Sequence, residues 1–178
     1  MAKIRGAQAR RTWAEVWRDE PLALLIATFL GAGFFPFASG TAGSAAGLVA
    51  AHLAWLAGGV WALLAFAILA AVLGIWASDR LVKSRGIGDP GEIVIDEVAG
   101  QALAYLPVVL LVPQPWLSMR FLAWAFAAFF LFRVIDVWKP GPVGRAEALP
   151  GGLGVMADDL LGGAIVGLLL GAVLWGMR

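Results

Sequence analysis

The stretch SAAGLVAAHLAWLAGGVWALLAFAILAAVLGIWA, residues 44–77, decides the fold of this chain. Its 34 residues carry no formal charge. As a single helix it would be about 50 Å long at 1.5 Å per residue, against roughly 30 Å of hydrocarbon in a bilayer. The run must therefore fold back on itself. Gly58 and Gly59 predict the turn, because they lie between Trp55 and Trp61, a residue type typical of the membrane interface.

The composition of the whole chain agrees with this stretch. Its 178 residues are 61% hydrophobic and only 14% charged, and the mean hydropathy is +0.86. A single soluble domain is not that apolar, so we expect an integral membrane protein. The chain contains no cysteine, which excludes disulfide frameworks, thiolate metal sites and cysteine nucleophiles.

Three further apolar segments follow the central run. They cover residues 93–112, 116–138 and 158–176, and they are separated by polar, glycine-rich or proline-rich sequence. Each is close to the length that crosses a bilayer as a helix. Together with the two arms of the central run, they predict an all-α, polytopic membrane bundle of about five spanning helices.

The first 20 residues are basic and amphipathic. Trp13, Val16 and Trp17 fall at i, i+3 and i+4, on one face of a helix. We expect residues 1–20 to lie at the membrane interface, and residues 21–178 to form a single membrane domain. Five cations support the interfacial segment: Lys3, Arg5, Arg10, Arg11 and Arg18.

Residues 22–38 are apolar but interrupted by Gly31, Gly33 and Pro36. These breaks disfavour a continuous spanning helix, and the segment lacks the small-residue cleavage site of a signal peptide. We therefore predict a short or re-entrant helix. With this arrangement every acidic cluster reaches one side of the membrane, together with eleven of the thirteen Lys and Arg residues. The positive-inside tendency identifies that side as the cytoplasmic one.

Five carboxylates lie at the ends of otherwise apolar segments. An ionised carboxylate at a membrane boundary is costly unless it is paired, hydrated or bound to a cation. Helix capping would explain one adjacent pair of acids. It would not explain why three predicted helices each place acidic residues at the same membrane boundary. The five are Asp96, Glu97, Asp136, Asp158 and Asp159.

Cationic and small residues accompany these acids. Arg133 and Lys139 share a helix face with Asp136, either as an ion pair with a neighbouring lysine or as part of a site. The small-residue segment 39–44 opens a helix, where free backbone N–H groups and hydroxyls can receive a phosphate. A site with oxygen ligands and no soft ligands suits Mg²⁺. The chemistry that follows is transfer of a phosphoryl group to water.

Four motifs resemble those of the phosphatidylglycerophosphatase A family of bacterial membrane lipid phosphatases. They are GAGFFPFASGTAGS at 31–44, GDPGEIVIDEVAGQ at 88–101, FRVIDVWKPGPV at 132–143 and GGLGVMADDLLGG at 151–163. Their order and spacing cover most of the chain beyond residue 28. The resemblance implies a magnesium-dependent enzyme that converts phosphatidylglycerophosphate to phosphatidylglycerol at the cytoplasmic face of the bacterial inner membrane. The expected partners are this lipid substrate and membrane lipids, and not a nucleic acid.

Our hypothesis is that the carboxylates bind the metal ion and that the basic side chains bind the phosphate. All five boundary carboxylates are candidate ligands or neighbours of one or two Mg²⁺ ions, which would polarise the phosphate and activate the attacking water. Direct attack by water and a covalent aspartyl-phosphate intermediate both remain open, as does the identity of the general base. The candidate catalytic residues are Asp96, Asp136, Asp159, Arg133 and Lys139.

The candidate phosphate-binding residues come from two parts of the sequence. Arg133 and Lys139 would hold the nonbridging oxygens, and the small-residue segment would hold the far side of the phosphate. Asp89 or Glu92 would make a peripheral contact with a metal or with glycerol. The small-segment candidates are Thr41, Gly43 and Ser44.

Other function classes fit the sequence less well. Histidine-based lipid phosphatases need two histidines, and this chain has His52 alone. The signature of CDP-alcohol phosphatidyltransferases is absent from the sequence. A membrane cation transporter or channel with boundary carboxylates is the main alternative, and a non-catalytic membrane scaffold is a third. A transport pathway would place polar residues at mid-membrane, where segments 44–77 and 160–177 are nearly featureless apart from His52.

Overall fold

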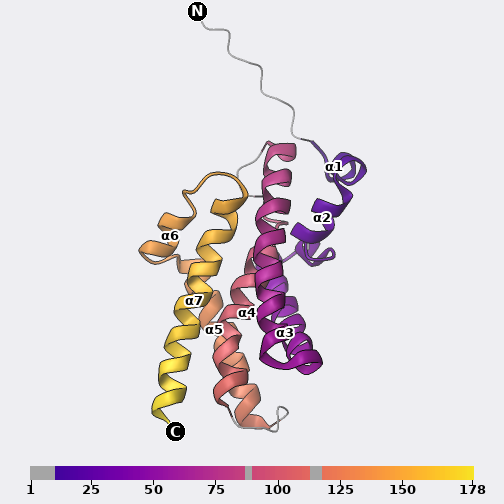
Figure 1. Ribbon diagram of the computed structural model, residues 1–178. Coiled ribbons are helices and arrows are strands. Elements are labelled where there is room, and N and C mark those ends of the chain that lie inside the picture. The colour runs from indigo at the N-terminus through magenta and orange to yellow at the C-terminus, as the bar shows by residue number, and fades with distance from the viewer. Residues whose placement is uncertain (1–10, 87–89, 113–117) are drawn as a thin grey trace, which may run out of the picture.

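The computed structural model describes residues 11–86, 90–112 and 118–178, and no strand occurs among them. This confirms the all-α prediction. Figure 1 shows the long helices running side by side along one axis, with the shorter helices gathered toward one end of the bundle. The elements are α1 (Trp13–Asp19), α2 (Pro21–Ala27), the 3₁₀ helix η1 (Ala32–Phe34), α3 (Ser39–Arg85), α4 (Ile95–Leu111), α5 (Met119–Trp138), α6 (Pro142–Ala146) and α7 (Gly152–Gly176).

Helix α3 is two arms joined by the predicted glycine turn. Gly58 and Gly59 have non-helical backbone angles, and Gly59 has a φ of 64°, which glycine adopts readily. The arms lie antiparallel, because both reach the start of α4. A Cβ added to Gly43 would lie 2.6 Å from the Val94 Cβ, and one added to Gly74 would lie 3.2 Å from Ile95 Cγ1. The prediction that the run folds back is confirmed.

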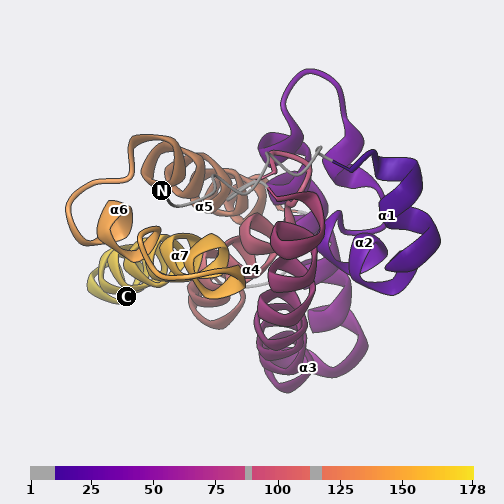
Figure 2. The same ribbon diagram turned by 90° about the horizontal axis from the view of Figure 1, so that it is seen from above.

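Close glycine contacts set the register of α4 against α7. A Cβ on Gly163 would lie 2.8 Å from the Cα of Gly100, and one on Gly167 would lie 2.8 Å from the carbonyl oxygen of Leu103. Both contacts advance in the same direction along the two sequences, so these helices run parallel. Figure 2 shows α4 enclosed by α3, α5 and α7 when the bundle is viewed from above. The central position of α4 explains why most of its residues are buried.

Helix α5 runs antiparallel to α4. At one end, the Phe121 ring lies 6.3 Å from the Tyr105 ring. At the other end, a Cβ on Gly100 would lie 2.6 Å from the Phe132 ring. The end of α5 and the start of α4 therefore lie at the same end of the bundle.

Within the part of the chain that the structure describes, three helices are long and apolar enough to cross a membrane by length and composition, namely α3, α5 and α7. Large apolar side chains project outward from them, and Trp61 and Leu168 are more than three-quarters exposed. Such surfaces are unfavourable in water and suit a lipid environment. Helix α4 is shorter, at 17 residues. The number of five spans stays a prediction, with the two arms of α3 counted separately.

The N-terminal elements pack on the second arm of α3. A capping box between Thr12 and Glu15 starts α1. Val16 is fully buried, and the Arg85 guanidinium lies 4.2 Å from the centre of the Trp13 ring. The face predicted to meet the membrane is thus partly covered by protein. Residues 1–10 lie outside the described residues, so the interfacial role of 1–20 stays a prediction.

The segment 22–38 is short and broken, as its glycines and proline indicate. Helix α2 has only seven residues, too few to cross a bilayer. Phe29, Leu30 and Gly31 then follow with positive φ angles and turn the chain. The amide of Val94 donates to the carbonyl of Ala27 at 2.9 Å, which fixes the end of α2 beside the start of α4.

Two helices begin earlier than the sequence analysis predicted. Helix α7 starts at Gly152 rather than residue 158, and α3 starts at Ser39 rather than residue 44. Glycine has a low helix propensity, so the 151–154 segment suggested a loop. Tertiary packing overrides that propensity, because Gly152 fits directly against the α3 backbone at Ile75 and Asp79. As a result, Asp158 and Asp159 lie in the second turn of α7 rather than at its start.

Candidate functional site

A cavity of about 630 Å³ opens where the ends of α3, α4, α5 and α7 meet. Its lining combines acidic, basic and apolar side chains from segments that are far apart in the sequence. The charged lining residues are Asp96, Glu97, Arg133, Asp136, Lys139, Glu147, Asp158 and Asp159.

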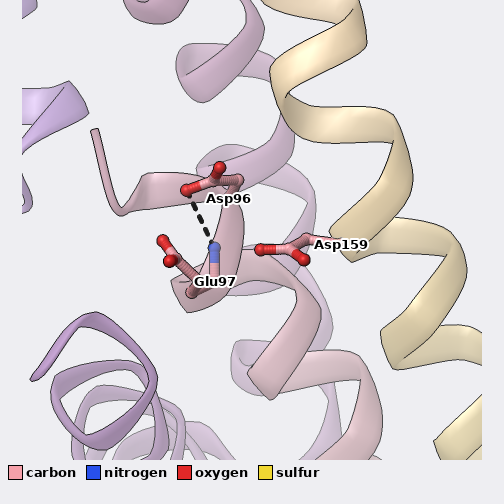
Figure 3. A group of neighbouring side chains, drawn as sticks. All are labelled: Asp96, Glu97 and Asp159. Atoms are coloured by element: carbon pink, nitrogen blue, oxygen red, sulfur yellow. Dashed lines mark hydrogen bonds between the residues drawn. The ribbon is translucent and has the colours of Figure 1, made fainter. Parts of the chain in front are cut away.

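Three carboxylates form the centre of this cavity. Asp96 and Glu97 come from the first turn of α4, as predicted, and Asp159 reaches toward them from α7 (Figure 3). One oxygen from each of the three lies within 4.8 Å of the others. The Asp96 carboxylate accepts a hydrogen bond of 3.0 Å from the Glu97 backbone N–H. Asp159 is only 3% exposed, so bulk water solvates its carboxylate poorly.

Arg133 and Asp136 occupy the neighbouring face, on the last turns of α5. Arg133 forms an ion pair with Asp136, and its Nη1 lies 3.8 Å from Oε1 of Glu97. The same guanidinium donates to the Ser44 hydroxyl at 3.2 Å. Asp136 is close enough to interact electrostatically with both Glu97 and Asp159. The predicted acids Asp96, Glu97, Asp136 and Asp159 are therefore brought together, with Arg133 beside them.

Lys139 anchors the other side of the cavity. Its ammonium lies 2.8 Å from Asp158 and 3.1 Å from Glu147. Burial by itself lowers the pKa of Lys139, but the interactions with Asp158 and Glu147 outweigh burial and raise that pKa above its ordinary value. Lys139 is therefore a permanently charged group at neutral pH.

The adjacent acids on α7 have different partners. Neighbouring side chains on a helix diverge by about 100°, so two adjacent acids can have different partners. Asp159 points to the α4 carboxylates, whereas Asp158 pairs with Lys139. Of the five candidate metal ligands, Asp158 thus lies outside the group of three, and Asp136 is engaged by Arg133.

The chemistry of the three-carboxylate group fits a hard divalent cation. Oε2 of Glu97 and Oδ1 of Asp159 are buried and have no hydrogen-bond partner in the structure. Buried carboxylates with unpaired oxygens are costly, and a cation bound among the three carboxylates would stabilise their charge. Only oxygen donors are present, as Mg²⁺ prefers. His52 is engaged elsewhere, with its Nδ1 2.7 Å from the Tyr105 hydroxyl.

The predicted phosphate-binding segment is helical, and its members have different surroundings. Thr41 is exposed and does not line the cavity, and Gly43 lies in close contact with Val94. Ser44 is buried and accepts the hydrogen bond from Arg133. Among these three candidates, Ser44 alone forms a hydrogen bond with a charged residue of the site, Arg133. Ser44 itself does not line the cavity.

Of the two peripheral candidates, the structure describes one. Asp89 lies outside the described residues. Glu92 accepts a hydrogen bond of 2.9 Å from the Trp13 indole N–H, away from the carboxylate group. Glu92 therefore contributes nothing to the described centre of the site.

Several lining residues were not among the named sequence candidates. Ser39 and Gly40 line the cavity at the start of α3, directly before the predicted Thr41. Their helical context could have been inferred only with the correct start of α3. Glu147 follows α6, and its pairing with Lys139 joins segments on either side of that helix. No local pattern in the sequence indicates that pairing.

Comparisons with known proteins match the chain to one family of membrane lipid phosphatases and to relatives that include three bacterial proteins. The model of the phosphatidylglycerophosphatase A family matches residues 25–174. The chain is 30% identical over 143 residues to phosphatidylglycerophosphatase A of Escherichia coli K12, covering 79% of this chain and 77% of the relative. It is 36% identical over 138 residues to the Haemophilus influenzae protein of the same name, covering 77% and 79%.

A third relative has a different name. It is a Bacteroides thetaiotaomicron protein, provisionally named a phosphatidylinositol-3-phosphatase, which is 36% identical over 166 residues. The match covers 89% of this chain and 97% of that protein. No solved structure matches the chain.

Proposed function

The chain belongs to the phosphatidylglycerophosphatase A family, and from that premise we propose that it is a magnesium-dependent lipid phosphatase. Its substrate would be phosphatidylglycerophosphate, and its products phosphatidylglycerol and inorganic phosphate. We further propose that it acts in the bacterial inner membrane, with the cavity facing the cytoplasm. The three long apolar helices support the membrane location.

The charge balance of the cavity is the observation that carries the proposal. Six carboxylates line it, against two cationic side chains. A phosphate monoester is itself an anion, and it would be repelled from such a cavity unless a multivalent cation were bound there. The three-carboxylate group supplies a place for that cation.

Five of the charged residues would act directly in the proposed reaction. Asp96, Glu97 and Asp159 would hold Mg²⁺, which would offset charge on the phosphate oxygens and lower the pKa of water in the site. Arg133 and Lys139 lie on two sides of the cavity and would stabilise the charge that develops on the transferred group. Hydrolysis forms a bond from a water oxygen to phosphorus and breaks the bond from phosphorus to the glycerol oxygen, which takes up a proton.

A second lipid is a candidate substrate because of the Bacteroides thetaiotaomicron relative. Its name indicates a phosphate on the inositol ring, whereas phosphatidylglycerophosphate carries its terminal phosphate on glycerol. Both are phosphate monoesters on a lipid headgroup, so the charge argument holds for either. The family model and two relatives favour the glycerol substrate. The same matches disfavour a cation transporter.

Phosphate release from purified, detergent-solubilised protein tests the proposal. Equal concentrations of phosphatidylglycerophosphate, phosphatidylinositol 3-phosphate and phosphatidic acid are compared after removal of divalent cations and after addition of Mg²⁺. We expect fastest release from phosphatidylglycerophosphate, and only with Mg²⁺. Faster release from the inositol lipid would favour the second substrate. If no lipid releases phosphate and the protein instead conducts cations across liposome membranes, the transporter alternative would be supported.

A further inference from the structure

Gln101 is a polar residue at a position where the fold provides no partner for it. It lies in the middle of α4 and is 0% exposed. Neither its amide nitrogen nor its amide oxygen has a hydrogen-bond partner in the structure. It belongs to none of the ion pairs or hydrogen bonds of the site described above.

Such a residue is costly to retain. Burial of an amide without hydrogen bonds destabilises the folded state, and Gln101 leaves both of its polar atoms unpaired. An apolar side chain of similar size would avoid that cost. Unpartnered buried groups of this kind are accounted for by a ligand, a water molecule or a functional state.

The position of Gln101 relates it to one carboxylate of the site. It follows Glu97 by four residues on the same helix, and side chains at i and i+4 lie on one face. Glu97 also has a buried oxygen without a partner, Oε2. A glutamine can donate through Nε2 to a carboxylate without adding a charge.

The helices around α4 restrict what else Gln101 can reach. Val98 is pressed against α3, since a Cβ on Gly47 would lie 2.7 Å from the Val98 Cα. Gly100 is pressed against Phe132 of α5, as described above. Gln101 is thus enclosed by packed helices, one turn further along α4 than the carboxylates.

We propose that Gln101 is a positioning residue for Glu97. In the cation-bound state its Nε2 donates a hydrogen bond to Oε2 of Glu97, so that the other oxygen of Glu97 faces the cation. This inference rests on the proposed cation-dependent function. It follows the general rule that a carboxylate ligand is itself hydrogen-bonded, which fixes its orientation and strengthens metal binding.

The test replaces Gln101 by methionine, which has a similar length and no amide. Thermal unfolding of the detergent-solubilised protein is followed by tryptophan fluorescence over a range of Mg²⁺ concentrations. We expect the unfolding midpoint without cation to stay the same or to rise, because two unpaired polar atoms are removed. The Mg²⁺ concentration that gives half of the stabilisation should increase about tenfold or more.

Tyr105→Phe is the matched control. It removes a buried polar atom from the same helix, one turn beyond Gln101, where the hydroxyl bonds His52. It should lower the unfolding midpoint and leave the Mg²⁺ dependence unchanged. Gln101→Asn keeps the amide but shortens its reach by one methylene, and it should also weaken the response to Mg²⁺, even if Gln101→Met fails to fold.

Activity gives a second readout of the same variants. Phosphate release by Gln101→Met should be low at limiting Mg²⁺ and should recover at saturating Mg²⁺, with an unchanged KM for the lipid. An unchanged Mg²⁺ dependence in both Gln101 variants would overturn the inference. A wild-type protein that showed no stabilisation by Mg²⁺ would instead contradict the proposed function itself.

Discussion

Asp159 is the residue on which the candidate site depends most. It is the one member of the three-carboxylate group that comes from α7, and it is 3% exposed with an unpartnered oxygen. Its neighbour Asp158 points to Lys139 instead. The two acids therefore divide the cavity into a carboxylate side and a lysine side.

Asp159→Asn should remove turnover and leave the fold intact. A bound cation supplies several kcal/mol of transition-state stabilisation, and each 1.36 kcal/mol corresponds to a factor of ten, so we expect kcat/KM to fall at least about 100-fold. Phosphate release and thermal unfolding are measured together. Asp19→Asn is the control, since Asp19 pairs with Arg11 outside the cavity. Full activity of Asp159→Asn would contradict this assignment.

The pair of Lys139 and Asp158 permits a double-mutant cycle. Lys139 has a φ of 47°, a conformation that glycine adopts without strain, so Lys139→Gly removes the ammonium and keeps the turn. It leaves Asp158 buried without its cation, and should destabilise the protein by less than the roughly 3–5 kcal/mol of a fully buried pair, because the Lys139 side chain is 31% exposed. Adding Asp158→Asn should restore stability but not phosphate release. Restored activity in the double variant would rule out a role for Lys139 in binding phosphate.

The individual site residues were only partly predictable from the sequence. The acids and cations were identified because charged side chains in apolar surroundings are energetically costly and therefore indicate a functional site. The division between Asp158 and Asp159 could not be derived, because it depends on the rotation of α7. Thr41 was selected for its hydroxyl, but the start of α3 at Ser39 leaves Thr41 exposed.

At the level of the helices, the contact between α4 and α7 holds the site together. Gly163 lies one turn after Asp159 and packs against Gly100, which follows Glu97 by three residues. The small size of both residues lets the two backbones approach. This approach brings the Asp159 carboxylate within reach of the α4 acids.

Gly163→Val should separate α4 from α7. The added side chain would meet the Gly100 backbone, and overpacking of this kind costs about 1–3 kcal/mol or more. We expect a lower unfolding midpoint together with a weaker response to Mg²⁺. Gly176→Val is the matched control, because a Cβ there meets nothing within 4 Å. Equal effects of the two substitutions would contradict the importance of this contact.

The helices themselves were more predictable than their ends. The fold-back of residues 44–77 followed from length, because one helix of that length would be too long for a bilayer, and its position followed from Gly58 and Gly59. The end of α5 before Pro140 followed from the backbone restriction that proline imposes. The starts of α3 and α7 were missed, because both begin in glycine-containing segments whose helical state depends on packing against other helices.

At the level of the whole molecule, the charged groups are distributed unequally between the two ends. The carboxylate cavity lies at the end where α5 finishes and α7 begins. Arg120 and Arg178 lie at the opposite end, where a second cavity is lined by both. The membrane character could be predicted from composition. The convergence of α4, α5 and α7 could not, because apolar helices can be packed in many arrangements and the choice depends on specific contacts such as those of the glycines.

The orientation in the membrane can be measured directly, because the chain has no natural cysteine to interfere with labelling. Single cysteines are introduced at Arg145, near the carboxylate cavity, and at Gly176, at the other end. In bacterial cells whose outer membrane has been made permeable and whose inner membrane is intact, a membrane-impermeant maleimide should label position 176 and not position 145. After lysis both should react. Labelling of both positions, or only of 145, before lysis would contradict a cytoplasmic cavity.

The central claim is that carboxylates from separate helices form one cation site, and direct binding of Mn²⁺ tests it. Carboxylate sites that suit Mg²⁺ also suit Mn²⁺, and free Mn²⁺ can be counted by electron paramagnetic resonance. Titration of the purified wild-type protein should reveal saturable binding that Mg²⁺ displaces, and Asp159→Asn should lose it. Binding of the same stoichiometry and affinity in Asp159→Asn, or no saturable binding to the wild type, would contradict the account.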